Sequence, residues 1–235
     1  MGGGGGEEGG GGAREGGSAG ERERERERER AFSLLEKTEE AMKEASWYAA
    51  ERHAVAALDL ALEAGDHELA ARACLPLQEA RRQRGLDAID AANGSVVMLD
   101  HIPAEIESVD PGVFLLYPNA VGADARRLRI AALQFEVPIF VVCREPDTRL
   151  GLVPVVALGG TTVRARIDPP EDPDAPTLEW VISAMEQLGD AAIDGLDPGL
   201  SGPQRIDALR SMLDSVPDHE RLHQALADAL RAAAG

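Results

Sequence analysis

Aromatic side chains are scarce in this sequence, at 3% of 235 residues. A hydrophobic core must therefore be built from smaller apolar residues, mainly Ala, Leu, Val and Ile. Lysine is rarer still, with only Lys37 and Lys43, and acidic residues outnumber basic ones by 42 to 24, for a net charge of -18. Because binding to nucleic acid depends on basic side chains that displace counterions, we expect neither nucleic acid nor an anionic membrane as a partner.

Cysteine is also nearly absent, and the two that occur, Cys74 and Cys143, lie far apart and outside any metal-ligand spacing. We expect both to be buried free thiols in a reducing compartment. The first residues are Gly and Glu rather than the basic and apolar segments of a signal peptide. The longest apolar stretch, 150–160, is much shorter than the roughly 20 residues that span a bilayer. These absences predict a soluble, cytoplasmic protein.

Residues 1–30 are predicted to be a disordered leader. The first 20 are mostly Gly, and a perfect Glu-Arg alternation follows from Glu21 to Arg30. In a helix, side chains three residues apart would carry opposite charges, and side chains four residues apart would carry like charges. The attraction and the repulsion contribute to helix stability in opposite directions and largely cancel.

Residues 31–94 are predicted to form a long helical hairpin, because strong helix formers carry apolar residues at helical spacing. The first helix is expected over 31–64 and the second over about 67–90. Between them, Gly65 suits the left-handed position that ends a helix, and Asp66 suits the cap of the next one.

The turn of this hairpin resembles that of a tetratricopeptide repeat over residues 54–85. Gly65, Asp66 and Ala70 match the turn and the first small residue of the family's second helix, whereas Ala54, Leu58 and Ala61 replace its usual aromatic, Gly and Tyr. No second copy follows at the 34-residue period of that family. The resemblance implies binding of a peptide or protein, and the alternative is a generic helical hairpin that packs on its neighbours.

Residues 95–168 are predicted to form a small α/β core. Four short apolar runs have the composition of strands buried on both faces of a parallel sheet. They occupy residues 96–99, 113–116, 139–142 and 153–158. An amphipathic helix from Ala123 to Phe135 separates the second run from the third, which predicts a right-handed β-α-β unit. Its polar face, with Arg126, Arg127 and Arg129, is expected to be exposed.

Gly159 and Gly160 have two interpretations. They fit the turn of a hairpin into an exposed edge strand, residues 161–167, whose polar and apolar residues alternate. They also fit a glycine loop for a ligand, but no helix start follows to offer its amides. We favour the hairpin, which makes the sheet parallel with a mixed edge.

The remaining chain is predicted to be an acidic, proline-rich linker at 169–176 followed by C-terminal helices in 177–235. We expect these helices over about 177–194, 203–215 and 219–234. Ser201 and Gln204 fit a capping box for the second helix, and Asp218 fits the cap of the third. The fold class is thus α/β, with helices on both sides of the sheet region in the sequence.

The last predicted helix contains the H-E-x-x-H pattern of zinc metalloproteases at His219, Glu220 and His223. In those enzymes two histidines one turn apart bind zinc, and the glutamate activates water. Here Asp218 places His219 in the first helical turn, Arg221 would bring a cation close to the metal, and no His, Glu or Cys follows His223 as a third ligand. We therefore interpret the pattern as a chance match on a packing helix, and we predict no metal.

A parallel sheet would also gather polar side chains along the rim at its strand ends. Asp100, His101, Cys143 and Glu145 are the candidates there, because such a set can support nucleophilic or acid-base catalysis. No glycine-rich phosphate-binding motif follows any strand, so we predict no cofactor.

The absence of a catalytic signature, together with the hairpin and the acidic helices, favours a non-enzymatic protein-interaction or regulatory protein. The alternative is a Rossmann-like protein or enzyme that binds a small ligand at the rim. A rim pocket that holds the four candidates in contact would favour the alternative.

Overall fold

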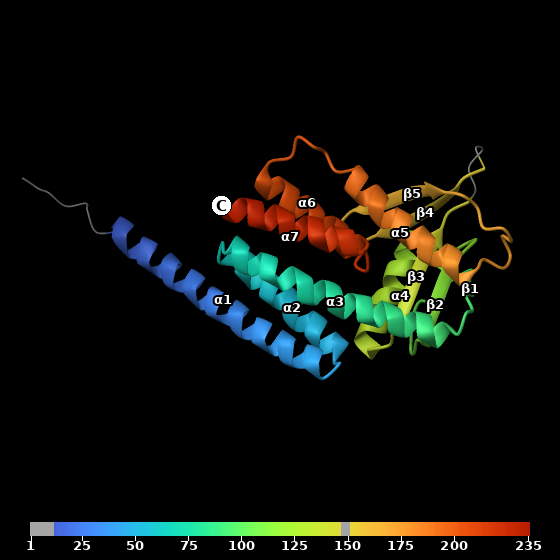
Figure 1. Cartoon of the computed structure of the whole chain (residues 1–235), viewed down its shortest axis with the longest axis horizontal. Coiled ribbons are helices and arrows are strands. Elements are labelled where there is room, and N and C mark those ends of the chain that lie inside the picture. Colours follow the sequence, from blue (N-terminus) through green and yellow to red (C-terminus); the bar gives the residue numbers. More distant parts are fainter. Residues whose placement is uncertain (1–11, 147–150) are drawn as a thin grey trace, which may run out of the picture.

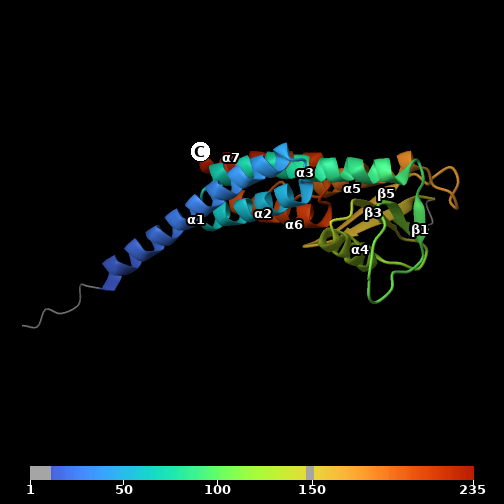
Figure 2. The ribbon, with the colours of Figure 1, turned by 90° about the horizontal axis from the view of Figure 1, so that it is seen from below.

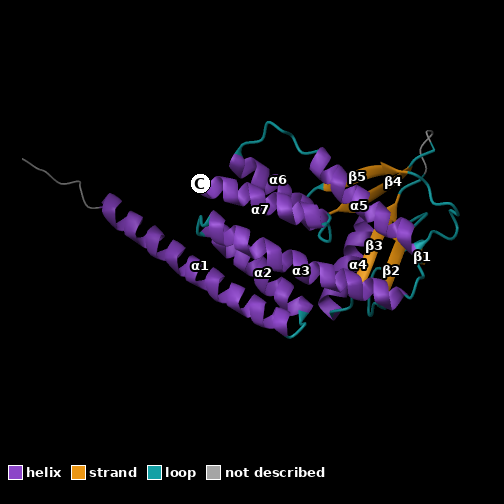
Figure 3. Ribbon diagram, viewed as in Figure 1, coloured by secondary structure: helices purple, strands orange, loops and turns teal. Residues whose placement is uncertain are grey.

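The strands lie together at one end of the molecule, and most of the helical length extends away from them (Figures 1 and 3). This computed structural model describes residues 12–146 and 151–235, with side chains from residue 19 onward. In these residues the helices are α1 (Gly12–Lys43), α2 (Trp47–Glu63), α3 (His67–Ala92), α4 (Gly122–Phe135), α5 (Leu178–Asp194), α6 (Gly202–Ser215) and α7 (Glu220–Ala234). The strands are β1 (Val97–Leu99), β2 (Gly112–Leu116), β3 (Ile139–Arg144), β4 (Val153–Leu158) and β5 (Thr162–Ile167).

The sheet confirms the predicted α/β class, with strands in the order β1-β2-β3-β4-β5. The first three strands are parallel, and β2, α4 and β3 form the predicted β-α-β unit. Strand β4 was expected to be parallel as well, but it pairs with β3 in the antiparallel sense. The cause is the short connection at 145–152, since a parallel crossover needs a dozen or more residues.

The β4–β5 hairpin is confirmed, with antiparallel pairs from Val153–Ile167 to Leu158–Thr162. Its turn lies directly against the end of α6. A Cβ on Gly159 would come within 2.5 Å of the Ser215 backbone nitrogen. The Ser215 hydroxyl donates a hydrogen bond to the Thr161 carbonyl at 2.6 Å. The glycines therefore allow a close approach between this turn and α6, and the ligand-loop interpretation is not needed to explain them.

The predicted disorder of residues 1–30 is wrong for the part that the structure describes. Helix α1 begins at Gly12 and continues through the Glu-Arg alternation to Lys43 (Figures 1 and 2). Extending an existing helix avoids the cost of nucleation, and the packed segment from Ala31 onward provides that helix. A tertiary ion pair adds to this, because Arg28 Nε lies 2.8 Å from Asp66 Oδ2. Residues 1–11 lie outside the described part.

The predicted single helix over 31–64 is also wrong, because the chain breaks between α1 and α2. Ala45 adopts a left-handed conformation with φ of 54°, and the Ser46 amide donates to the Ala41 carbonyl at 2.8 Å. This closes α1 in the way a glycine usually does. The turn between α2 and α3 follows the prediction, with Gly65 at φ of 73° and the Asp66 side chain capping the Leu69 amide at 2.9 Å.

The largest core cluster runs without interruption from the helices onto one face of the sheet. It joins small residues of α2 and α3, such as Ala57 and Ala73, to Leu115 and Val155 of the sheet and Leu226 of α7. Helix α3 contacts both α7 and the strands β2 and β3 (Figure 1). The opposite face of the sheet is covered by α4 (Figure 2). No helix in the described residues combines the length and hydropathy needed to cross a membrane.

The C-terminal region contains the three predicted helices after a segment, 168–177, without helix or strand. The capping box at the start of α6 is confirmed, with the Ser201 amide donating to Gln204 Oε1 at 3.1 Å. The predicted cap of α7 is wrong, because His219 occupies the N-cap position in place of Asp218. Asp218 instead faces a cluster of arginines, described below.

Gly189→Ala is expected to lower the free energy of unfolding by about 2–3 kcal/mol. Gly189 lies on α5 beneath the buried His219 ring, and an added Cβ would come within 2.1 Å of the ring Cγ. Gly85→Ala is the matched control, since no atom lies within 4 Å of its Cβ position on α3. That change is expected to stabilise the helix by about 0.5–1 kcal/mol. Urea unfolding of both variants measures the difference, and equal shifts in the same direction would contradict the packing argument.

Candidate functional site

The four predicted rim residues do not form one cluster. Asp100 and His101 pair with each other at 2.6 Å, and the His101 side chain is 80% exposed. Glu145 forms a two-pronged ion pair with Arg164, at 2.8 and 2.7 Å, which lowers the pKa of its carboxyl group. Among the described residues, no hydrogen bond or ion pair joins these two groups to Cys143 or to each other.

Cys143 is poorly suited to nucleophilic catalysis. Its side chain is fully buried beneath α4, with Sγ 3.7 Å from the Ala120 carbonyl oxygen. Burial raises the pKa of this thiol to about 12, so the reactive thiolate is scarce at neutral pH. Cys74 is buried as well, and burial raises its pKa to about 12.

The two histidines of the H-E-x-x-H pattern face different partners. His219 lies against α5, with Nε2 at 3.3 Å from Asp190 and 3.5 Å from Glu186. His223 is buried, and its Nε2 lies 2.9 Å from the Pro217 carbonyl oxygen. Burial lowers the pKa of His219, and it lowers the pKa of His223 to about 3. In the described part of the chain, no group of three or more His, Cys, Asp or Glu side chains is placed to hold a metal ion.

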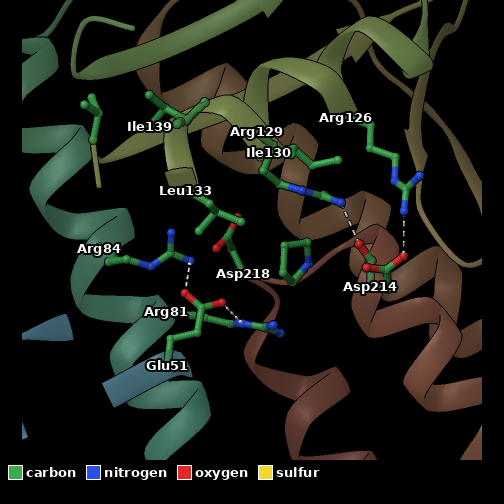
Figure 4. Close-up of a pocket in the computed structure, with 13 residues that line it drawn as sticks. Glu51, Arg81, Arg84, Arg126, Arg129, Ile130, Leu133, Ile139, Asp214 and Asp218 are labelled. Atoms are coloured by element: carbon green, nitrogen blue, oxygen red, sulfur yellow. Dashed lines mark hydrogen bonds and ion pairs between the residues drawn. The ribbon is translucent and has the colours of Figure 1, made fainter. Parts of the chain in front are cut away.

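A different site lies where α2, α3, α4 and the α6–α7 connection meet (Figure 4). It is a cavity of about 100 Å³ whose charged lining consists of Arg81, Arg84, Arg126, Arg129, Glu51, Asp214 and Asp218. We call it the arginine cavity. Four arginines against three acids are unusual in a chain with a net charge of -18. Its position brings together segments that are far apart in the sequence.

On one side of the cavity, two arginines of α3 hold one glutamate of α2 (Figure 4). Arg81 Nε lies 2.7 Å from Glu51 Oε1, and Arg84 Nη2 lies 2.9 Å from Glu51 Oε2. Burial alone would raise the pKa of Glu51, but the attraction of the two arginines outweighs it, and the pKa is lowered. Glu51 is therefore a buried carboxylate that stays charged.

On the other side, two arginines of α4 hold the end of α6. Arg129 donates hydrogen bonds to the carbonyl oxygens of Asp214 at 2.6 Å and Ser215 at 2.8 Å. These are orphan carbonyls at a helix C-terminus, where a cation is favourable. Arg126 Nη2 lies 3.5 Å from the Asp214 carboxylate. The prediction of an exposed arginine face on α4 is thus wrong at Arg129, which binds the end of α6, whereas the side chains of Arg126 and Arg127 are 42% and 40% exposed.

Asp218 lies between these two groups (Figure 4). Burial raises the pKa of its carboxyl group, although Arg84, Arg129 and Arg81 favour the charged form. Among the described residues, this carboxyl group forms no hydrogen bond and has no ion-pair partner within 4 Å. The three arginines therefore act on Asp218 across a gap, and the arginine cavity occupies that region.

Two guanidinium groups in the lining retain unused donors. The Nε atoms of Arg84 and Arg126 are buried, and neither meets an acceptor with hydrogen-bond geometry among the described residues, although the Arg84 guanidinium lies over the Tyr48 ring, with Cζ 5.1 Å from the ring centroid. A buried donor without an acceptor costs about 1–3 kcal/mol, more when it is charged. The cavity can hold several water molecules, since one needs about 10–15 Å³. It also has room for a small oxyanion.

No protein-family model, curated protein or solved structure matches this chain. The chemistry available in the arginine cavity is the binding of oxygen atoms that carry negative charge, because guanidinium groups donate in a planar fork that fits carboxylate and phosphate.

The sequence contained one signal for this site. Arg81 and Arg84 are three residues apart on α3, and Arg126 and Arg129 are three apart on α4. Side chains at this spacing share a helix face, where like charges repel unless an anion lies near them. Such paired arginines predict a counter-charge, but only the fold shows that both pairs face one cavity.

Proposed function

We propose that this protein is a non-enzymatic regulatory protein that binds a small oxyanion in the arginine cavity. The observation that carries the proposal is the pair of buried, unpaired Nε donors of Arg84 and Arg126 in a cavity lined by four arginines. The oxygens of a phosphate or carboxylate supply the acceptors that these donors lack. The raised pKa of Asp218 favours its protonated form, and a protonated carboxyl group can donate a hydrogen bond to such an oxygen.

The position of the cavity supports a regulatory role. Its lining comes from α2 and α3 of the helical end, from α4 of the sheet end, and from the α6–α7 connection. An anion bound there contacts elements of both ends and stabilises their packing in proportion to its occupancy. We propose that a protein partner in the cytoplasm binds the helical end and that its binding depends on this change in packing. The tetratricopeptide-like hairpin at 54–85, which includes Arg81 and Arg84, is consistent with such a partner.

Inorganic phosphate is expected to bind wild-type protein and to bind Arg84→Gln and Arg126→Gln at least about 10-fold more weakly. A hydrogen bond to a charged group contributes about 1.5–3 kcal/mol, and 1.4 kcal/mol corresponds to a factor of ten. Isothermal titration calorimetry measures the dissociation constants. Arg166→Gln is the matched control, because Arg166 is exposed on β5 and lies outside the cavity.

Circular dichroism of each variant checks that the fold is kept before titration. Absence of phosphate binding to wild-type protein at millimolar concentration would refute the proposal. Equal binding by wild type, Arg84→Gln and Arg126→Gln would refute it too, because the cavity arginines would then have no part in recognition.

A further inference from the structure

A groove between α2 and α4 lies beside the arginine cavity. It has a volume of about 700 Å³, within the range of about 300–1,000 Å³ that is typical of ligand pockets. The groove and the cavity share four lining residues, which are Glu51, Arg81, Ile130 and Leu133. The two hollows are therefore neighbours, and the lining of the groove is less charged than that of the cavity.

The walls of the groove are mainly apolar near the cavity. Val55 and Ala56 of α2 face Ile130 and Leu133 of α4. Ile130 is 42% exposed, which leaves a large apolar side chain in contact with water. Covering such a side chain with apolar atoms is favourable by about 25 cal/mol for each Å² removed from water. The groove thus favours an apolar group next to the anion site.

Charged side chains mark the outer part of the groove. Arg52 of α2 and Glu136 at the end of α4 lie 2.5 Å apart, and both belong to the lining. Asp59, also in the lining, is paired with Arg210. Because these charges already have partners, the groove offers no unpaired charge to a second polar group of the ligand.

We infer that the natural ligand is an amphipathic acid, with a carboxylate or phosphate head in the arginine cavity and an apolar body in the α2–α4 groove. This inference rests on the proposed function and specifies the class of ligand. The head binds to arginine donors of the cavity, and the body covers Ile130. A ligand with a head alone leaves the groove empty, and an apolar ligand alone leaves the donors unpaired.

A series of phosphate monoesters tests the inference, because the head is constant while the body grows. Methyl, butyl and octyl phosphate, each below the concentration at which it forms micelles, are compared with inorganic phosphate by calorimetry. Each buried methylene is expected to tighten binding by about 4-fold until the groove is filled. Octyl phosphate is therefore expected to bind at least about 10-fold tighter than methyl phosphate.

Two variants locate the body of the ligand. Ala56→Gln places a polar but uncharged side chain in the groove outside the cavity lining, so it should reduce the gain with chain length and leave inorganic phosphate binding unchanged. Leu75→Gln is the control. Leu75 is 67% exposed in a separate groove between α1 and α3, and its replacement should leave both measurements unchanged.

The outcomes separate this inference from the proposed function. If wild-type protein binds inorganic phosphate but octyl phosphate binds no tighter, the amphipathic ligand is wrong and the anion site stands. If octyl phosphate binds tightly and Arg84→Gln has no effect on it, the head does not occupy the cavity and the inference fails. Loss of the chain-length gain in Leu75→Gln but not in Ala56→Gln would also overturn it. Absence of inorganic phosphate binding refutes the proposed function itself.

Discussion

Glu51→Ala is expected to lower the free energy of unfolding by about 3–5 kcal/mol, the typical cost of removing one partner from a buried ion pair. Glu51 is 8% exposed and accepts from Arg81 and Arg84, whose side chains are nearly as buried. Removing the carboxylate leaves two cations close together with little solvent to screen them. Urea unfolding followed by circular dichroism at neutral pH measures the loss.

Glu79→Ala provides the matched control for this substitution. Glu79 also accepts from an arginine and a second donor, Arg82 and Gln83, but its ion pair is about one-third exposed. Exposed pairs of this kind contribute little to stability because solvent screens the attraction. Similar losses in the two variants would show that burial does not determine the contribution of the Glu51 group.

Replacement of the whole triad of Arg81, Glu51 and Arg84 tests what its charges contribute to the free energy of unfolding and to phosphate binding. Replacing all three by apolar residues of similar volume removes the charges together, and such replacements are often neutral or stabilising. The triple variant Glu51→Met, Arg81→Met and Arg84→Leu is therefore expected to be more stable than Glu51→Ala. It should nevertheless lose phosphate binding. A triple variant that kept phosphate binding would contradict the proposed role of these arginines.

The sheet was the part of the fold that could best be predicted from the sequence. Val113 to Leu116 and Ile139 to Val142 are apolar at every position, and strands buried on both faces have this composition because each face is covered by helices. The direction of β4 was the exception. The composition of a strand indicates how buried the strand is, but it does not indicate the direction of the strand. Only the short connection at 145–152 could have indicated an antiparallel strand.

Local rules failed where a distant residue decided the outcome. The Glu-Arg alternation has balanced local charges, but α1 is extended from a packed segment and Arg28 pairs with Asp66. Asp218 has the residue type and the sequence position of a helix cap. In the fold, however, three arginines from α3 and α4 act on its carboxyl group. The same holds for the arginine cavity, where Glu51 meets Arg81 and Arg129 meets Ser215. Periodicity along one helix cannot predict such pairs.

Acidification from pH 7 to pH 5 is expected to destabilise the protein, with His223 contributing about 2 kcal/mol of the loss. Burial lowers the pKa of His223 in the folded state to about 3, against an ordinary value of about 6.5. Between these two values the unfolded chain binds a proton that the folded protein does not. Stability is therefore fully present above about pH 6.5 and falls as the pH is lowered, by about 1.4 kcal/mol for each pH unit.

His223→Gln isolates this contribution, because its side-chain amide can still donate to the Pro217 carbonyl oxygen but does not titrate. The charged and titratable groups that act on His223, Arg81 and His219, stay in place in both proteins. Urea unfolding at pH 7 and pH 5 should show that the variant loses about 2 kcal/mol less than wild type. His101→Gln removes a histidine whose side chain is 80% exposed, and this variant should keep the wild-type loss. A loss in His223→Gln equal to that of wild type would mean that His223 is protonated in the folded protein, and then the α6–α7 connection that carries Asp218 would not exclude water as the structure requires.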